Sequence, residues 1–219
     1  MTALSGAVGD EDNDIVCSED ESSTAFELHG LFWMSPNQVQ QARRYRAVLI
    51  HDNTYGSNSR GMKLGLFTSI NMHGHTVLLG QCLIATETYD DYVWQFNTYL
   101  EASSATPMVV FTDRDPALEQ ALNDALPELT THLWCIWHIG QNLKKNTKLN
   151  AELQAMNKDS QEFRSQFYNL NKCVGKHNFR NLWNEFLATY PGYPAEYMQE
   201  SLGGDLMKRW AMPWQVSCL

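Results

Sequence analysis

Apolar residues in this chain fall into short, nearly continuous runs that are separated by polar segments. Five of these runs have the length of a strand and are bounded by turn signals: 45–52, 62–71, 75–85, 106–113 and 131–139. The second and third runs are joined by a short connection that contains Gly74, which favours an antiparallel hairpin. The pattern therefore predicts a sheet whose first three strands form a meander.

Between the runs, the apolar period changes from that of a strand to that of a helix. Residues 88–103 place five apolar side chains at helical spacing: Tyr89, Tyr92, Val93, Phe96 and Leu100. Two further helices are predicted in 34–46 and 114–127. Each begins with a favourable cap residue followed by proline, Ser35-Pro36 in the first and Asp115-Pro116 in the second.

The predicted order is three strands, helix, strand, helix, strand. We therefore expect an α/β fold, in which a mixed sheet combines an antiparallel meander with parallel strands and flanking helices. Residues 1–30 are acidic and rich in serine, and they are expected to form a disordered tail. The folded core is expected to span 31–147. A helical segment is expected over 148–219, where one apolar face unites Phe179, Leu182, Trp183, Phe186 and Leu187.

The charge of the chain does not exclude DNA as a partner. The formal net charge is -9, but residues 1–27 hold eight acidic residues and no Lys or Arg, which leaves 17 acidic against 16 basic residues elsewhere. Five scattered cysteines without a CxxC pair indicate reduced thiols and an intracellular location. Because the sequence shows no secretory signal and no apolar run near the roughly 20 residues that span a bilayer, we expect neither secretion nor a membrane partner.

Two acidic residues stand at the ends of predicted central strands. Asp52 and Asp113 are 61 positions apart, and loops at the carboxyl ends of strands in an α/β sheet commonly hold ligand-binding side chains. Two neighbouring carboxylates repel each other unless a cation neutralises them, and oxygen ligands suit Mg²⁺ or Mn²⁺. The alternative is that Asp52 begins an Asx-turn and that Asp113 pairs with Arg114 on the surface.

Four motifs occur in a fixed order: "HDNTYG" with Asp52, Thr54 and Tyr55; "ATETYDDYVWQF" with Glu87; "FTDRDPAL" with Asp113 and Asp115; and "CIWHIGQN" with Cys135, His138 and Asn142. Together they resemble the catalytic core of the Mutator-like element (MULE) transposases, which are related to the FAR1-type transposase-derived factors. The resemblance covers residues 45 to 146. It implies an RNase H-like fold and a triad of acidic residues that binds two divalent metal ions for DNA cleavage and strand transfer.

The resemblance assigns Asp52 and Asp113 to the first two catalytic and metal-binding acids. The third acid is expected to lie beyond these 219 residues, and its identity is unknown. Three downstream carboxylates, those of Glu185, Glu196 and Glu200, are expected to be solvated charges on helices rather than metal ligands. This chain is therefore expected to be a truncated copy, in which unaided catalysis is uncertain.

Other functions remain open at this point. The chain could be a domesticated, transposase-derived DNA-binding or regulatory protein without catalysis, or a plain nuclease of the RNase H type. The expected partner is DNA at transposon ends, the expected location is the nucleus or another intracellular compartment, and a homo-oligomer is possible. Candidate phosphate contacts are Arg43, Arg44, Lys144 and Lys145, with Lys172, Lys176 and Arg180 further along.

Two local patterns have competing interpretations. Cys135 and His138 could supply two zinc ligands, with His132, Cys173 and His177 as possible partners, but a structural site needs about four, so the sequence does not favour zinc. The aromatic residues of 182–198 and 209–215 could stack on exposed bases. We expect them instead to form the core of the helical segment.

Overall fold

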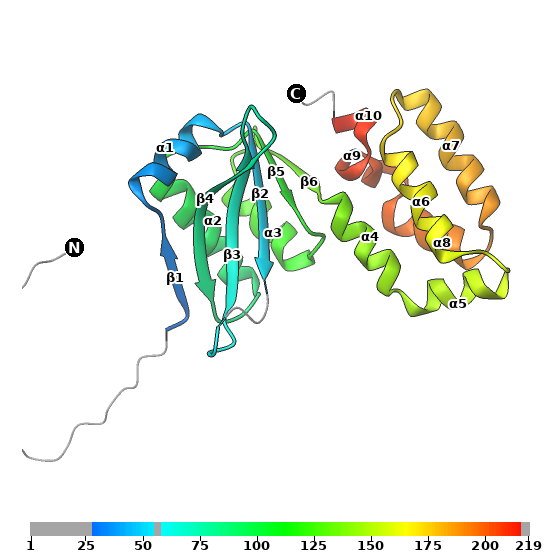
Figure 1. The fold of residues 1–219 in the computed structure, drawn as a ribbon, viewed down its shortest axis with the longest axis horizontal. Helices are drawn as coiled ribbons and strands as arrows, with labels where there is room; N and C mark the ends of the chain where they lie inside the picture. Colours follow the sequence, from blue (N-terminus) through cyan, green and yellow to red (C-terminus); the bar gives the residue numbers. More distant parts are fainter. Residues whose placement is uncertain (1–27, 55–57, 216–219) are drawn as a thin grey trace, which may run out of the picture.

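A computed structural model describes residues 28–54 and 58–215 of the chain. Within these residues, six strands form one sheet in the order β1-β4-β3-β2-β5-β6 (Figure 1). The strands are β1 (Gly30–Trp33), β2 (Val48–Thr54), β3 (Lys63–Ile70), β4 (Thr76–Ile84), β5 (Val109–Thr112) and β6 (Thr131–Trp134). The expected disordered tail falls mainly on residues 1–27, which lie outside the described residues.

The sheet has an antiparallel part and a parallel part. β2, β3 and β4 pair antiparallel as a meander, whereas β2, β5 and β6 pair parallel to one another. The mixed α/β sheet predicted from the apolar runs is therefore confirmed. β1, which pairs antiparallel with β4, was not predicted from the sequence.

Helices α1 (Pro36–Arg44), α2 (Tyr89–Ser103) and α3 (Pro116–Ala125) pack with the strands around one apolar core. The predicted caps are confirmed. Ser35 forms a capping box with Gln38 at the start of α1, and the Asp115 side chain accepts a hydrogen bond from the Leu118 backbone N–H at the start of α3. α2 contributes Tyr92, Phe96 and Tyr99 to the core.

Two predicted strand ends were wrong. β2 continues two residues beyond Asp52 because the backbone of Asn53 and Thr54 still pairs with β3. The apolar run 131–139 is not one strand, since β6 ends at Trp134 and α4 begins at Ile136. The run looked continuous because the apolar residues Ile136 and Trp137 at the start of the helix directly follow the buried strand.

The rest of the described chain is helical. It contains α4 (Ile136–Lys145), α5 (Thr147–Ala155), α6 (Ser160–Asn171), α7 (Lys176–Thr189), α8 (Tyr193–Leu202), the 3-10 turn η1 (Gly204–Leu206), α9 (Met207–Trp210) and α10 (Met212–Gln215). We call α5 to α10 the helical unit. It packs beside the β6 edge of the sheet and is joined to it by α4 (Figure 1).

The helical unit has a core of its own, rich in aromatic rings. Phe163, Phe167, Phe179, Trp183 and Trp210 are buried there, and Trp134 of β6 belongs to the same cluster. The expectation that these aromatic residues form a core holds for the buried rings. Across residues 28–54 and 58–215, none of the helices combines the length and apolar character needed to cross a bilayer.

Candidate active site

Asp52 and Asp113 lie at equivalent positions of two adjacent parallel strands. β2 and β5 pair with Val48 opposite Val109 and Ile50 opposite Phe111, a constant offset of 61 residues. The same offset separates Asp52, which lies within β2, from Asp113, which directly follows β5. Because alternate residues of a strand point to one face, the two carboxylates project from the same face at the same level of the sheet.

Both carboxylates line one cavity of about 360 Å³. Its wall is built by four sequence regions: the end of β2, Glu87 and Tyr92, Asp113 and Leu118, and one side of α4. The full lining consists of His51, Asp52, Asn53, Thr54, Glu87, Tyr92, Asp113, Leu118, Trp137, His138, Gln141, Asn142 and Lys145. The cavity therefore concentrates polar groups at the carboxyl ends of β2 and β5, where the sequence placed the site.

His138 faces the first of the two acids. Its Nε2 atom lies 3.5 Å from Oδ1 of Asp52, and the Asp52 side chain remains about half exposed, at 48%. Cys135 is the N-cap residue of α4, and its thiol hydrogen-bonds to His138 and raises the pKa of the histidine. The charges of Asp52 and Asp113 raise this pKa further, whereas burial lowers it. The raised pKa of His138 thus favours its protonated form beside Asp52.

The interaction between Cys135 and His138 also affects the cysteine. Burial by itself would raise the pKa of the Cys135 thiol, but hydrogen bonds with His138 and with the backbone of Trp137 and His138 lower it below the usual value. A thiol at the start of a helix commonly shows this shift. Cys135 thus supports the orientation of His138 and is not itself part of the cavity wall.

Glu87 is held at the other side of the cavity by two neighbours. Asn53 donates a hydrogen bond from Nδ2 to Oε1 of Glu87 at 3.2 Å, and the Tyr92 hydroxyl donates to the same oxygen at 3.4 Å. These bonds join β2 to the start of α2. A third carboxylate thus lies in the wall that contains Asp52 and Asp113.

The pKa values of both aspartates are raised, mainly by burial and in part by neighbouring carboxylates. Burial raises the pKa of Asp52, and the charge of Glu87 adds to this, while His138 acts in the opposite sense. Burial likewise raises the pKa of Asp113, with contributions from Asp115, Asp52 and Glu87 and with His138 again opposing them. The cavity therefore carries more negative charge than its protein neighbours neutralise, which is the condition under which a cation binds.

The donor groups fit a hard divalent cation. Two carboxylates at the same level of adjacent strands, beside the side-chain oxygen of Gln141, offer the oxygen ligands that Mg²⁺ and Mn²⁺ prefer. In residues 28–54 and 58–215, no group of three or more His, Cys, Asp or Glu side chains has the arrangement of a complete metal cage. Mg²⁺ does not require such a cage, because it commonly binds through one or two carboxylates, water and substrate phosphates.

Five further residues singled out from the sequence line the same cavity: Thr54, Glu87, His138, Asn142 and Lys145. Asp115 caps α3 two residues after Asp113, and Lys144 is exposed on α4 outside the cavity wall. Tyr55 lies outside the described residues. Arg43 and Arg44 lie on α1, where Arg43 donates to the Ser103 carbonyl oxygen and Arg44 lies over the Tyr45 ring.

The local alternatives for the two acids do not describe the structure. Asn53 and Thr54 are strand residues, so Asp52 does not begin a turn. Arg114 does not pair with Asp113 among the described residues; it hydrogen-bonds instead to the carbonyl oxygen of Ser201 and lies over the Trp134 ring. The two acids are therefore free to face the cavity.

The downstream carboxylates and the candidate zinc partners lie elsewhere. Glu185, Glu196 and Glu200 are exposed on helices α7 and α8 and do not line the cavity of Asp52 and Asp113. His132 bonds to the Thr112 hydroxyl in the interior, and buried Cys173 accepts a hydrogen bond from Asn178. His177 interacts with Asn181.

Six residues of the cavity lining were not predicted as site residues: His51, Asn53, Tyr92, Leu118, Trp137 and Gln141. Trp137 and Gln141 are four residues apart on α4, which places them on one side of that helix. The helical period of α4 could have identified them, had its start at Ile136 been recognised. The contacts of Asn53 and Tyr92 with Glu87 join distant parts of the chain, so no local pattern indicates them.

Comparison with known proteins identifies the domain. A family model described as the MULE transposase domain matches residues 48–142, which include every residue of the cavity lining except Lys145. The chain belongs to the MULE and FAR1-type family of transposase-derived proteins, as its motifs indicated.

The relatives that match are plant proteins. The chain is 32% identical over 187 residues to "Protein FAR1-RELATED SEQUENCE 5" of Arabidopsis thaliana. This alignment covers 83% of this chain and 22% of the relative. It is 33% identical over 113 residues to "Protein FAR-RED IMPAIRED RESPONSE 1" of the same organism, which covers 51% of this chain and 14% of the relative. The chain thus spans about a fifth or less of the length of these relatives.

Among solved structures, the chain aligns with the HTLV-2 integrase catalytic core domain, determined in complex with magnesium in a dimeric form. The identity is 16% and the TM-score is 0.29, over 51% of this chain and 74% of that chain.

Proposed function

We propose that this domain is the catalytic core of a MULE-type DNA transposase, in which Asp52 and Asp113 hold divalent metal ions for cleavage and transfer of DNA strands. The observation that carries the proposal is the equivalent position of the two carboxylates on adjacent parallel strands. Membership of the MULE family supports the same assignment. The expected location is the nucleus, where the DNA substrate lies.

The topology also supports an RNase H-like fold. The antiparallel β2-β3-β4 meander is followed by β5, which pairs parallel with β2, and by β6, which pairs parallel with β5. In this arrangement β2 is the central strand, and Asp52 lies near its carboxyl end. A backbone fixed on both sides by sheet hydrogen bonds holds a metal ligand with the rigidity that catalysis needs.

Four residues of the cavity have defined roles in this proposal. Asp52 and Asp113 bind the metal ions, which when bound activate the attacking oxygen and stabilise the leaving oxygen at phosphorus. His138 lies against Asp52 and limits the repulsion between the carboxylates. Lys145, at the end of α4, lines the cavity where it would contact a phosphate of the substrate strand.

Glu87 is the third carboxylate of the cavity and a further candidate metal ligand in this proposal. It approaches the site from the start of α2 and is oriented by Asn53 and Tyr92. Within the described residues it is the carboxylate that lines the cavity together with Asp52 and Asp113. Its substitution by Gln therefore belongs in any test of the metal site.

The alternative function is a transposase-derived DNA-binding or regulatory protein without catalysis. The similarity to the FAR1-type proteins favours this alternative. Asp52 and Asp113 would then be retained from an active ancestor. The two functions make different predictions about Mg²⁺, because DNA binding through basic side chains does not require a metal ion.

A nicking assay distinguishes the two functions. Supercoiled plasmid is incubated with the protein and Mg²⁺ or Mn²⁺, and conversion to open circles is followed for the native chain, Asp52→Asn and Asp113→Asn. The matched control is Glu152→Gln, which removes an exposed acid on α5. Metal-dependent nicking that both Asp variants lose and the control retains supports the transposase function. DNA binding without nicking in either metal supports the regulatory alternative.

A further inference from the structure

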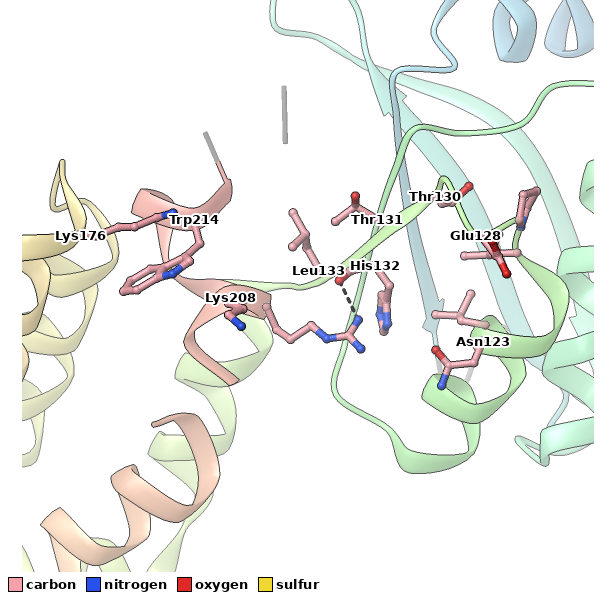
Figure 2. A pocket seen from close by; sticks show the side chains of 13 residues that line it. Asn123, Glu128, Thr130, Thr131, His132, Leu133, Lys176, Lys208 and Trp214 are labelled. Atoms are coloured by element: carbon pink, nitrogen blue, oxygen red, sulfur yellow. Dashed lines mark hydrogen bonds between the residues drawn. The ribbon is translucent and has the colours of Figure 1, made fainter. Parts of the chain in front are cut away.

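A second cavity lies between the sheet and the helical unit, away from the acids. Its volume is about 610 Å³, and it is bounded by the end of α3, the edge strand β6, and residues of α7, α9 and α10 (Figure 2). None of its lining residues is shared with the cavity of Asp52 and Asp113. We call it the lateral cleft.

One wall of the lateral cleft is cationic. Lys176 of α7 and Lys208 and Arg209 of α9 line it. Arg209 is anchored, since its Nη1 donates to the carbonyl oxygen of His132 at 2.9 Å (Figure 2). This bond fixes the guanidinium beside β6 and uses one of its five N–H donors. An anion that enters the cleft therefore meets an arginine that is already oriented.

The two lysines of this wall remain accessible. Lys208 is 61% exposed and forms an ion pair with Asp205 at 2.7 Å, an exposed pair of little net energy. Lys176 lies with its Nζ 5.8 Å from the centre of the Trp214 ring. Within the lining of the cleft, Glu128 is the single acid against three basic residues. The local charge is thus positive, although the chain as a whole is acidic.

The remaining surface of the cleft suits a base and a sugar. Trp214 supplies an indole ring, and Leu122, Leu126 and Leu133 add apolar area. Hydroxyl and amide groups are supplied by Thr130, Thr131 and Asn123 (Figure 2). The wall also contains His132, which is only 7% exposed and whose Nδ1 has no hydrogen-bond partner in the structure. A buried polar atom of this kind is usually satisfied by water or by a ligand.

From these features we propose that the lateral cleft binds an unpaired nucleic acid strand, with its phosphates against Lys176, Lys208 and Arg209 and a base stacked on Trp214. Cations beside an aromatic ring are the combination that binds single strands without sequence preference. A free phosphate would use the cations but not the indole. A base-paired duplex would use the cations but does not offer a base face for stacking.

The proposal rests on the proposed function only for the class of ligand, since the cleft is separate from the metal-binding acids. A strand bound there would leave the β6 edge of the sheet and run toward α4, on which Lys145 lines the other cavity. The lateral cleft would thus hold a single-stranded part of the DNA substrate outside the reacting site.

The test is binding of a fluorescent oligothymidylate, followed by anisotropy in EDTA so that no metal-dependent chemistry contributes. The double variant Lys176→Gln/Lys208→Gln is compared with Lys158→Gln/Arg164→Gln, which removes the same charge from the α5–α6 region. We expect the cleft variant to bind roughly tenfold more weakly. Its plot of log affinity against log salt concentration should also be shallower by about 1.4, because each lost phosphate contact removes about 0.7. The control should bind as the native chain does.

Three further comparisons make the outcome decisive. Trp214→Leu should weaken binding of the oligonucleotide without changing the salt dependence, because stacking is not electrostatic. Equal losses in the cleft and control variants would overturn the proposal, as would equal competition by inorganic phosphate and by unlabelled single strand at matched phosphate concentration. Glu152→Gln, which changes an exposed acid on α5, should bind normally in EDTA; because this measurement needs no metal, failure of the nicking assay does not affect it.

Discussion

Arg114 donates a hydrogen bond from Nη1 to the carbonyl oxygen of Ser201, 2.9 Å away at the end of α8. Its guanidinium also lies 4.7 Å from the centre of the Trp134 ring of β6. Arg114 directly follows Asp113 in the chain, so one residue connects the loop of the second acid with the helical unit. The position of the helical unit is therefore coupled to the loop of the candidate site.

We expect Arg114→Ala to lower the free energy of unfolding by about 1–2 kcal/mol, because it removes a charged hydrogen bond and a cation–π contact. Arg114→Lys should recover only part of this loss, since an ammonium group does not reproduce the planar guanidinium. Urea denaturation measures the effect. Arg180→Ala, at an exposed position on α7, is the control. A loss of similar size in the control would show that Arg114 has no special role between the sheet and the helical unit.

The raised pKa of Asp113 predicts a conflict between stability and metal binding. At neutral pH the ionised carboxylate is disfavoured by burial and by the neighbouring acids. Without metal, Asp113→Asn should therefore raise the free energy of unfolding by roughly 0.5–1 kcal/mol after screening by solvent.

Added Mg²⁺ should stabilise the native chain but not the variant. A cation that binds only the folded state stabilises it by an amount that grows with the logarithm of the cation concentration once this exceeds the dissociation constant, and so raises the melting temperature. The Asp113→Asn variant should lose this response, whereas Glu152→Gln should keep it. Differential scanning fluorimetry with and without Mg²⁺ measures both effects. An unchanged response in Asp113→Asn would count against Asp113 as a metal ligand.

The sequence predicted the elements whose signals are local. The caps at Ser35 and Asp115 require only two or three neighbouring residues, and the offset of 61 between Asp52 and Asp113 was already visible in the chain. The strand after Asp52 and the start of α4 were not predicted correctly. In both places the boundary is decided by a partner that is distant in sequence, namely β3 in the first case and the core of the helical unit in the second.

The same distinction applies to the site. The motifs identified Asp52, Asp113, Glu87 and His138, because each belongs to a short recognisable segment. They did not indicate that Asn53 would orient Glu87, since the two residues are 34 positions apart. The lateral cleft was missed for the same reason. Its cations and its indole belong to helices that meet β6 only after the chain has folded.

Gly65 of β3 lies next to Cys82 and next to Asn53, the residue that orients Glu87 in the candidate site. A Cβ atom at this position would lie 2.6 Å from Sγ of Cys82 and 2.8 Å from Oδ1 of Asn53. Gly65→Ala should therefore destabilise the fold by about 1–3 kcal/mol, as overpacking of a core commonly does. It should also displace Asn53 and so disturb its bond to Glu87.

Cys82→Ala provides the matching partner for a double-mutant cycle with Gly65→Ala. Because the closest clash is with Sγ of Cys82, the double variant should be more stable than the sum of the single effects predicts. Urea denaturation of the four proteins gives the interaction energy. Strictly additive effects would mean that Gly65 is not constrained by Cys82.

His132 makes the stability of the domain depend on pH. Burial, together with the nearby charge of Arg209, lowers its pKa from the ordinary value of 6.5 to about 4. Its ring bonds to the Thr112 hydroxyl at 2.8 Å. The unfolded chain therefore takes up a proton near pH 6.5, whereas the folded chain does so only near pH 4. Stability contributed by the neutral histidine is present above pH 6.5 and is lost as the pH falls toward 4.

Between pH 7 and pH 5, protonation of this one residue should lower the free energy of unfolding by about 2 kcal/mol. Urea denaturation at several pH values measures this slope. The variant His132→Gln retains a polar group beside Thr112 but does not titrate, so its stability should fall less over the same interval. His75→Gln, in the exposed connection between β3 and β4, is the control and should leave the slope unchanged. If His132→Gln and the native chain showed the same slope, the pKa of His132 would have to be the same in the folded and unfolded chain, contrary to its burial beside Arg209.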